Sequence, residues 1–173
     1  ADACRRHRTV EDCRHLRAKP LQASRSASAA SAADPLHYSR LDLPRGDLWV
    51  FTYGSLMWDP GFRHVEAQPA LLRGYHRSFC IYSSRYRGTV DKPGLVLGLD
   101  PGGACRGMVY RIAAAEVGDA LEALWQREMR RGVYVPRMLP VTAAARRRPA
   151  LAFLANRGHK GYAGRLALES CAA

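Results

Sequence analysis

A single acidic residue at a position where an apolar side chain is expected is the first candidate for chemistry in this sequence. Residues 114–131 have helical spacing and composition, and Gly132 suits the end of that helix. On a wheel of about 100° per residue, Glu128 falls within about 20° of Leu121, near the middle of the apolar face. Ionised carboxylates avoid such a position unless they are paired or are needed there. Glu128 is therefore a candidate for acid–base chemistry.

Two structural explanations of Glu128 remain open at this point. The carboxylate can pair with Arg131, three residues further along the helix, or with an arginine of the next strand. The helix can also fray at this point, which would leave the side chain in solvent. By contrast, Asp119 and Glu122 fall on the polar side of the wheel and are expected to be ordinary solvated charges.

A second candidate is the turn Tyr53-Gly54-Ser55-Leu56, which follows the apolar run 48–53. A glycine at such a turn allows successive backbone N–H groups to point into one concavity. That arrangement holds carboxylates or a developing oxyanion. The alternative is a strand that simply ends at a turn.

Other chemical motifs are missing from the sequence. It contains no GxGxxG, P-loop, HExxH or GxSxG pattern. The cysteines are odd in number and form no CxxC pair, so we predict neither a disulfide framework nor a metal site, and we expect a reduced, cytoplasmic setting. Cys80 and Cys105 lie in strand-like segments and are expected to be core residues.

The elements that must position these candidates are short strands around one good helix. Gly and Pro punctuate the chain, and the strand-like runs are 48–53, 71–82, 94–99, 105–112, 134–142 and 149–155. We read Arg146-Arg147-Arg148 as a solvated turn between the last two strands. This pattern predicts an α+β fold with a small, mixed, curled or barrel-like sheet and one main helix.

Length and charge suit one soluble domain. The chain has 173 residues and a formal net charge of +12. Residues 1–47 are rich in Ala, Ser and Arg, and we expect a disordered extension there, followed by a domain over 48–173. The apolar runs are too short for a membrane span, so no membrane insertion is expected. No aromatic platform accompanies the basic residues, so no nucleic-acid partner is expected either. The sequence leaves the oligomeric state unknown.

The motifs taken together resemble one known family. The segments that carry the resemblance are Trp49-Val50-Phe51-Thr52-Tyr53-Gly54-Ser55-Leu56-Met57-Trp58, Leu72-Arg73-Gly74-Tyr75-His76-Arg77-Ser78-Phe79-Cys80, Lys92-Pro93-Gly94-Leu95-Val96-Leu97-Gly98-Leu99, Leu124-Trp125-Gln126-Arg127-Glu128-Met129, Tyr134-Val135-Pro136-Arg137 and Gly161-Tyr162-Ala163-Gly164. In this order they resemble the ChaC-like γ-glutamylcyclotransferases, from about Leu48 to Glu169.

The resemblance implies cleavage of glutathione, the small-molecule substrate, to 5-oxoproline and cysteinylglycine without ATP, metal or redox cofactor. It also implies that Glu128 is the general base. The substrate-binding loop would comprise Val50, Phe51, Thr52, Tyr53, Gly54 and Ser55, with Leu56 next to it. Tyr134 and Tyr162 would supply hydroxyls to the pocket. Arg87 would meet a substrate carboxylate or make a structural pair.

Two departures from the family pattern leave alternatives open. Thr52 stands where the family usually has glycine, and the family's C-terminal helical continuation is expected to be missing after Ala173. A β-branched residue at position 52 can narrow the pocket or alter the loop. The alternatives are a cyclotransferase for other γ-glutamyl amines or amino acids, and a basic, non-catalytic regulator of a transport protein.

Overall fold

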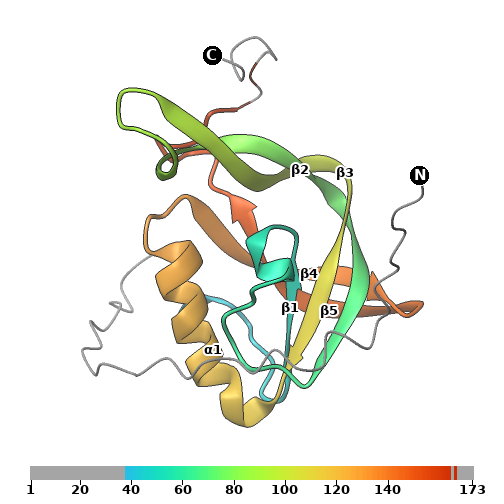
Figure 1. Ribbon diagram of the computed structural model, residues 1–173. Coiled ribbons are helices and arrows are strands. Elements are labelled where there is room, and N and C mark those ends of the chain that lie inside the picture. The colour runs from blue at the N-terminus through green and yellow to red at the C-terminus, as the bar shows by residue number, and fades with distance from the viewer. Residues whose placement is uncertain (1–37, 165, 167–173) are drawn as a thin grey trace, which may run out of the picture.

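Five strands close into a mixed barrel in the computed structural model, which describes residues 38–164 and 166 (Figure 1). The strands are β1 (Leu48–Thr52), β2 (Glu66–Gly88), β3 (Pro93–Ile112), β4 (Tyr134–Ala143) and β5 (Arg146–Ala155). The helix α1 (Val117–Leu124) lies between β3 and β4 in the chain, and short 3-10 turns occupy Tyr38–Arg40, Ser55–Met57 and Ala114–Glu116. The predicted α+β fold with a barrel-like mixed sheet and one main helix is confirmed.

The order of strands around the barrel is β1-β3-β2-β4-β5, and β1 closes it against β5. The β1–β5 contact is parallel and pairs Val50 with Leu151, whereas the other neighbours are antiparallel. The carboxyl end of β1, from which the turn at Gly54 starts, therefore lies between β3 and β5. β2 pairs with β4 over Ala70–Leu72 only, and beyond Leu72 it pairs with β3 alone among the strands described, so β2 and β3 extend from the barrel as a long two-stranded arm.

The segments 94–99 and 105–112 are one strand, so their prediction as separate strands is wrong. β3 runs through Gly102 and Gly103, and the pairing of β2 with β3 shifts register between Arg73 and Tyr75. Gly74, Gly102 and Gly103 all have positive φ. These glycines form a bulge that bends two long strands around the barrel, where the sequence suggested a break.

The helix predicted over 114–131 is three different helical segments. Ala114–Glu116 is a 3-10 turn, α1 covers Val117–Leu124, and Trp125–Met129 is a π-helical turn. In that turn the Arg130 N–H donates to the Trp125 carbonyl at 3.1 Å, which is the five-residue spacing of a π-helix. The π turn means that a uniform wheel does not describe the residues after Leu124.

The core begins before the predicted domain boundary at Leu48. Tyr38 is buried and packs edge-to-face on Trp125, with ring centroids 5.7 Å apart. Leu41 and Leu43 pack against the same cluster, which includes Val50 and Leu124. The folded domain therefore extends back to Tyr38, and the rest of the predicted extension, residues 1–37, lies outside the described residues.

The predicted turn at Arg146–Arg148 is wrong by a few residues. These arginines are paired with Val141–Ala143 at the start of β5, and the two-residue loop is Ala144-Ala145. Both alanines have positive φ, 46° and 60°. Sequence reasoning missed this hairpin because such turns usually carry Asn or Gly. Arg148 instead lies over the Trp49 ring, with its guanidinium carbon 4.1 Å from the ring centroid.

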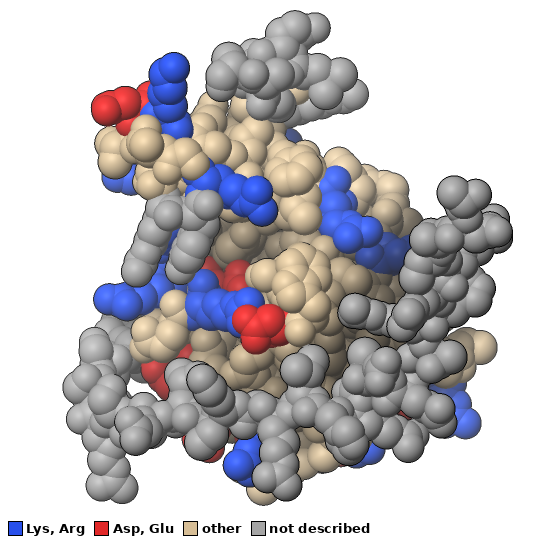
Figure 2. All heavy atoms as spheres, in the orientation of Figure 1, with Lys and Arg blue, Asp and Glu red and all other residues tan. Residues whose placement is uncertain are grey.

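Figure 2 shows basic side chains at several places on this face, and acidic side chains lie directly beside those near its centre. No helix within the described residues combines the length and the apolar character that a bilayer span requires.

Candidate active site

Glu128 lies inside the π turn, on the side that faces the barrel. Its side chain is 15% exposed, and the neighbouring Trp125 and Met129 are buried. The wheel was right about burial, although the extra residue in the π turn, rather than ideal α-helical spacing, sets where the carboxylate lies. Sequence pattern could not reveal this turn.

The charge of Glu128 acts on three tyrosines from other parts of the chain. Burial raises the pKa of Glu128 above the usual range, and the nearby Arg127 guanidinium acts in the opposite direction. The charge of Glu128 in turn adds to the burial that raises the pKa values of Tyr38, Tyr53 and Tyr134. Glu128 is therefore a carboxylate with increased basicity next to phenols that stay neutral.

The predicted turn after β1 is present and folds as a 3-10 turn. Met57 N–H donates to the Gly54 carbonyl at 2.9 Å, and the Trp58 and Asp59 N–H groups donate to the Ser55 carbonyl. The leading N–H groups of a helical turn have no acceptor within the turn. The amides of Gly54, Ser55 and Leu56 are the groups at this leading end, as the sequence predicted.

Arg127 joins this turn to Glu128. Its Nη2 donates to Ser55 Oγ at 3.2 Å, and its Nε lies 3.7 Å from Glu128 Oε1. The two candidates from the sequence are thus brought together in one place. Sequence analysis assigned Arg127 no role, and its position next to Glu128 in the family-like motif was the only available signal.

The first residues of the predicted substrate loop are framework residues. Val50 and Phe51 are fully buried in the core, so their side chains support β1, and the part of this segment in substrate binding stays a prediction. Thr52 is 1% exposed, and its hydroxyl donates to the Met108 carbonyl at 3.2 Å. Its β-branched side chain therefore fastens β1 to β3.

The hydroxyls of Tyr53 and Tyr134 have backbone partners. Tyr53 donates to the Phe153 carbonyl at 2.9 Å, and Tyr134 donates to the Leu97 carbonyl at 2.8 Å. The charge of Glu128 nevertheless acts on both phenols and raises their pKa values. These two tyrosines shape the surroundings of the carboxylate, and Leu56 supports the turn from the core.

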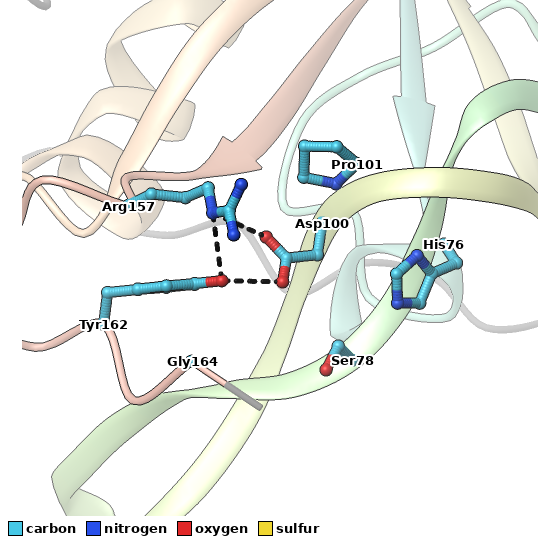
Figure 3. Close-up of a pocket in the computed structure, with 7 residues that line it drawn as sticks. All are labelled: His76, Ser78, Asp100, Pro101, Arg157, Tyr162 and Gly164. Atoms are coloured by element: carbon cyan, nitrogen blue, oxygen red, sulfur yellow. Dashed lines mark hydrogen bonds and ion pairs between the residues drawn. The ribbon is translucent and has the colours of Figure 1, made fainter. Parts of the chain in front are cut away.

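Tyr162 lines a cavity, which Figure 3 shows at close range. This cavity of about 510 Å³ is lined by His76, Ser78, Asp100, Pro101, Arg157, Tyr162 and Gly164. The Tyr162 hydroxyl donates to Asp100 Oδ2 at 2.7 Å and accepts from Arg157 Nε at 3.1 Å. Glu128 is not among the residues that line this cavity, and the predicted role of Tyr162 toward substrate stays a prediction.

Arg87 lies apart from Glu128. It is exposed near the end of β2, next to the turn into β3, and no contact with Glu128 is present among the residues described. Its predicted role toward a substrate carboxylate stays a prediction.

The two described cysteines are core residues, as predicted. Cys80 and Cys105 are buried and not in a disulfide. Burial raises the pKa of the Cys80 thiol to about 11, which keeps it protonated and poorly nucleophilic. Within the described part of the chain, no cluster of three or more His, Cys, Asp or Glu side chains is arranged to hold a metal ion.

Comparison with known proteins identifies relatives of this fold and of these motifs. The Escherichia coli (strain K12) protein named glutathione-specific gamma-glutamylcyclotransferase is 42% identical over 91 residues, covering 53% of this chain and 39% of that protein. The Homo sapiens protein named glutathione-specific gamma-glutamylcyclotransferase 1 is 34% identical over 131 residues, covering 70% of this chain and 59% of that protein. The chain thus spans less than two thirds of the length of these relatives.

A solved structure supports the fold. The selenomethionine-labelled γ-glutamylcyclotransferase specific to glutathione from yeast superposes with a TM-score of 0.67 and 19% sequence identity, covering 73% of this chain and 76% of that one. The sequence pattern of the family described as ChaC-like protein matches residues 48–173, which include β1–β5, the Gly54 turn and Glu128. On this match, the chain belongs to the ChaC-like protein family.

Proposed function

We propose that this domain is a γ-glutamylcyclotransferase that cleaves glutathione to 5-oxoproline and cysteinylglycine. The observation that carries the proposal is the buried Glu128 carboxylate, with its raised pKa, joined through Arg127 to the turn at Ser55. The names of the E. coli and human relatives supply the substrate class.

The reaction is an internal displacement. The α-amine nitrogen of the γ-glutamyl group attacks its own γ-carbonyl carbon and closes a five-membered lactam. The bond between that carbon and the cysteinyl nitrogen then breaks, and the electron pair leaves with the nitrogen. Because nucleophile and electrophile belong to one molecule, the protein mainly has to hold the attacking conformer.

Glu128 moves the proton in this scheme. Its carboxylate first pairs with the substrate ammonium and accepts one proton, which frees the amine to attack. The carboxyl passes this proton to the departing nitrogen, then takes the second proton from the new lactam nitrogen and passes it to the amine of cysteinylglycine, which leaves as an ammonium. Burial raises the basicity of Glu128 toward that of the groups between which it transfers the proton.

In this scheme the turn after β1 binds negatively charged oxygen atoms of the substrate. We assign the amides of Gly54, Ser55 and Leu56 to the substrate α-carboxylate or to the carbonyl oxygen as it gains charge. Tyr53 and Tyr134 form the wall next to Glu128. The positive charge of residues 48–173, +9 from eighteen basic and nine acidic side chains, favours capture of an anionic tripeptide.

The test is incubation of the purified chain with glutathione alone, followed by chromatographic measurement of 5-oxoproline and cysteinylglycine. Glu128→Gln should lower the rate by about 10²–10⁴-fold and leave the fold intact by circular dichroism. Glu122→Gln is the matched control, because Glu122 lies on the same helix, is exposed and bonds only to Gln126 within the described contacts.

Two results would contradict the proposal. If Glu128→Gln kept the parent rate, Glu128 would not be the base. If γ-glutamylalanine at equal concentration were turned over faster than glutathione, the substrate assignment would be wrong.

A further inference from the structure

One guanidinium holds three parts of the candidate site. Arg127 Nη1 donates to the Asp59 carbonyl at 2.8 Å and lies 3.3 Å from Asp59 Oδ2. Its Nη2 donates to Ser55 Oγ at 3.2 Å, and its Nε lies 3.7 Å from Glu128 Oε1. The turn after β1 and the π turn are thus joined through one side chain, although they are about seventy residues apart in sequence.

The absence of a side chain at Gly61 leaves space for the Arg127 guanidinium. The side chain of Arg127 is 29% exposed. It passes next to Gly61, where an added Cβ would lie 3.1 Å from Arg127 Nη1. Gly61 has a φ of +72°, so a residue with a side chain would be strained there as well as crowded. The guanidinium fork fits acceptors on two sides, which the single ammonium of lysine does not reproduce.

Two neighbouring residues of the π turn serve two different sides. Side chains at successive helical positions do not face each other. Arg127 reaches outward to Ser55 and Asp59, while the Glu128 carboxyl is buried toward the barrel. Fixing Arg127 from outside therefore fixes the turn that carries Glu128 inside.

Arg127 is also the cation that acts on Glu128. The groups that face Glu128 from other elements are Tyr38 next to α1, Tyr53 after β1 and Tyr134 on β4. Burial keeps these phenols neutral, so they do not compensate for the carboxylate charge. Burial raises the pKa of Glu128, and Arg127 opposes that rise.

We propose that Arg127 is a positioning residue that sets both the placement of Glu128 against the Ser55–Asp59 turn and the charge balance at Glu128. This role rests on the proposed cyclotransferase function. It predicts two separable contributions, one from the geometry of the guanidinium fork and one from its positive charge.

The experiment compares Arg127→Lys and Arg127→Gln with the parent. Lysine keeps the charge and loses the fork, so kcat/KM should fall by about 10–10²-fold while the pKa of Glu128 stays near the parent value. Glutamine loses both, so the fall in kcat/KM should be larger and the pKa of Glu128 should rise. The pKa is read by NMR titration of ¹³C-labelled glutamate carboxyls, with Glu128→Gln identifying the signal.

Arg130→Gln is the matched control. It removes the same charge from the end of the π turn, where the exposed Arg130 side chain makes no contact with Ser55, Asp59 or Glu128 in the described structure. It should leave both kcat/KM and the pKa of Glu128 at the parent values.

The outcomes separate this inference from the function on which it rests. If the parent forms no 5-oxoproline but Arg127→Gln still raises the pKa of Glu128, the proposed function fails and the charge balance at Glu128 stands. If the parent is active but both Arg127 variants match it in kcat/KM and in the pKa of Glu128, the positioning role is overturned. An equal loss of thermal stability in both variants without a change in that pKa would show a structural role only.

Discussion

The hydroxyl of Tyr53 donates a hydrogen bond of 2.9 Å to the carbonyl oxygen of Phe153, and so joins the end of β1 to its neighbouring strand β5. This bond lies three residues beyond Val50 on β1 and two residues beyond Leu151 on β5, where the two strands make their parallel contact. The residue from which the Gly54 turn starts is therefore anchored to β5. The contacts of β1 with the barrel, and not the short sequence of the turn, set the position of the turn.

Replacing Tyr53 with Phe should destabilise the domain. The substitution removes the donor and leaves the Phe153 carbonyl buried without that partner, which costs about 1–3 kcal/mol. Denaturant unfolding at constant m value measures the loss. Tyr75→Phe is the control, because Tyr75 packs against the same core cluster and has no hydrogen bond among the described contacts of its hydroxyl. It should change the free energy of unfolding by less than about 0.5 kcal/mol, and an equal loss in both variants would argue against the Phe153 bond.

The raised pKa of Glu128 predicts a characteristic pH dependence of stability. An exposed glutamate titrates near about pH 4.3, and burial moves Glu128 upward in the folded state. Below the unfolded-state pKa, Glu128 is protonated in both states and burial costs no ionisation. As the pH rises from there through the folded-state pKa, the folded protein loses stability relative to a variant without the carboxyl.

Unfolding of the parent and of Glu128→Gln between pH 4 and pH 8 checks this sign. The parent should lose stability relative to the variant across the lower part of this range and then run parallel to it. On the acid side, kcat/KM should fall at a higher pH than the pKa of an ordinary glutamate, because the base must be ionised to act. A parent that gained stability over the variant with rising pH would mean that the pKa of Glu128 is lowered.

The sequence identified two candidate features but not how they are arranged in space. Glu128 stood out because a carboxylate on an apolar face is costly, and the turn at Gly54 stood out because glycine ends an apolar run. Both inferences depend on local patterns of about one turn or one strand. The structure then places these two features next to each other.

What the sequence could not supply depends on tertiary contacts. Nothing in Trp125–Met129 distinguishes a π turn from an α-helix, because the backbone spacing is set by what packs around it. Gly102 and Gly103 suggested a break, yet opposite Gly74 they make a bulge within paired strands. The sequence assigned Arg127 no role, because its contacts with the Ser55–Asp59 turn join segments that are far apart in the chain.

Gly107 and Gly118 differ in the space around them, so replacing each with alanine tests the packing of the barrel near the site. A Cβ built on Gly107 would lie 2.1 Å from the Thr52 carbonyl oxygen and 2.8 Å from Phe51 Cζ. Backbone cannot yield as a side chain can, so Gly107→Ala should push β1 away from β3 and cost about 1–3 kcal/mol or more. Gly118 in α1 has nothing within 4 Å of such an atom, so Gly118→Ala should stabilise by about 0.5–1 kcal/mol.

Thermal unfolding of both glycine variants gives the comparison. Because Thr52 precedes the Gly54 turn, Gly107→Ala should also lower the rate of 5-oxoproline formation, whereas Gly118→Ala should not. A Gly107→Ala protein as stable as the parent would mean that the β1–β3 contact is looser than the described distances imply.

The loop between β4 and β5 offers a gain in stability at a position far from Glu128 in sequence. Ala144 and Ala145 both adopt positive φ, a region in which a Cβ costs about 1–2 kcal/mol per residue. Both lie between the paired residues Ala143 and Arg146, so the two-residue loop requires this conformation. Ala144→Asn with Ala145→Gly should therefore raise the free energy of unfolding by about 1 kcal/mol or more, since Asn-Gly suits such a turn. The control is Ala114→Gly: Ala114 lies in a 3-10 turn and has no positive φ, so glycine there should bring no gain. If the Asn-Gly variant unfolded at a lower denaturant concentration than the parent, the strain assigned to this hairpin would be absent.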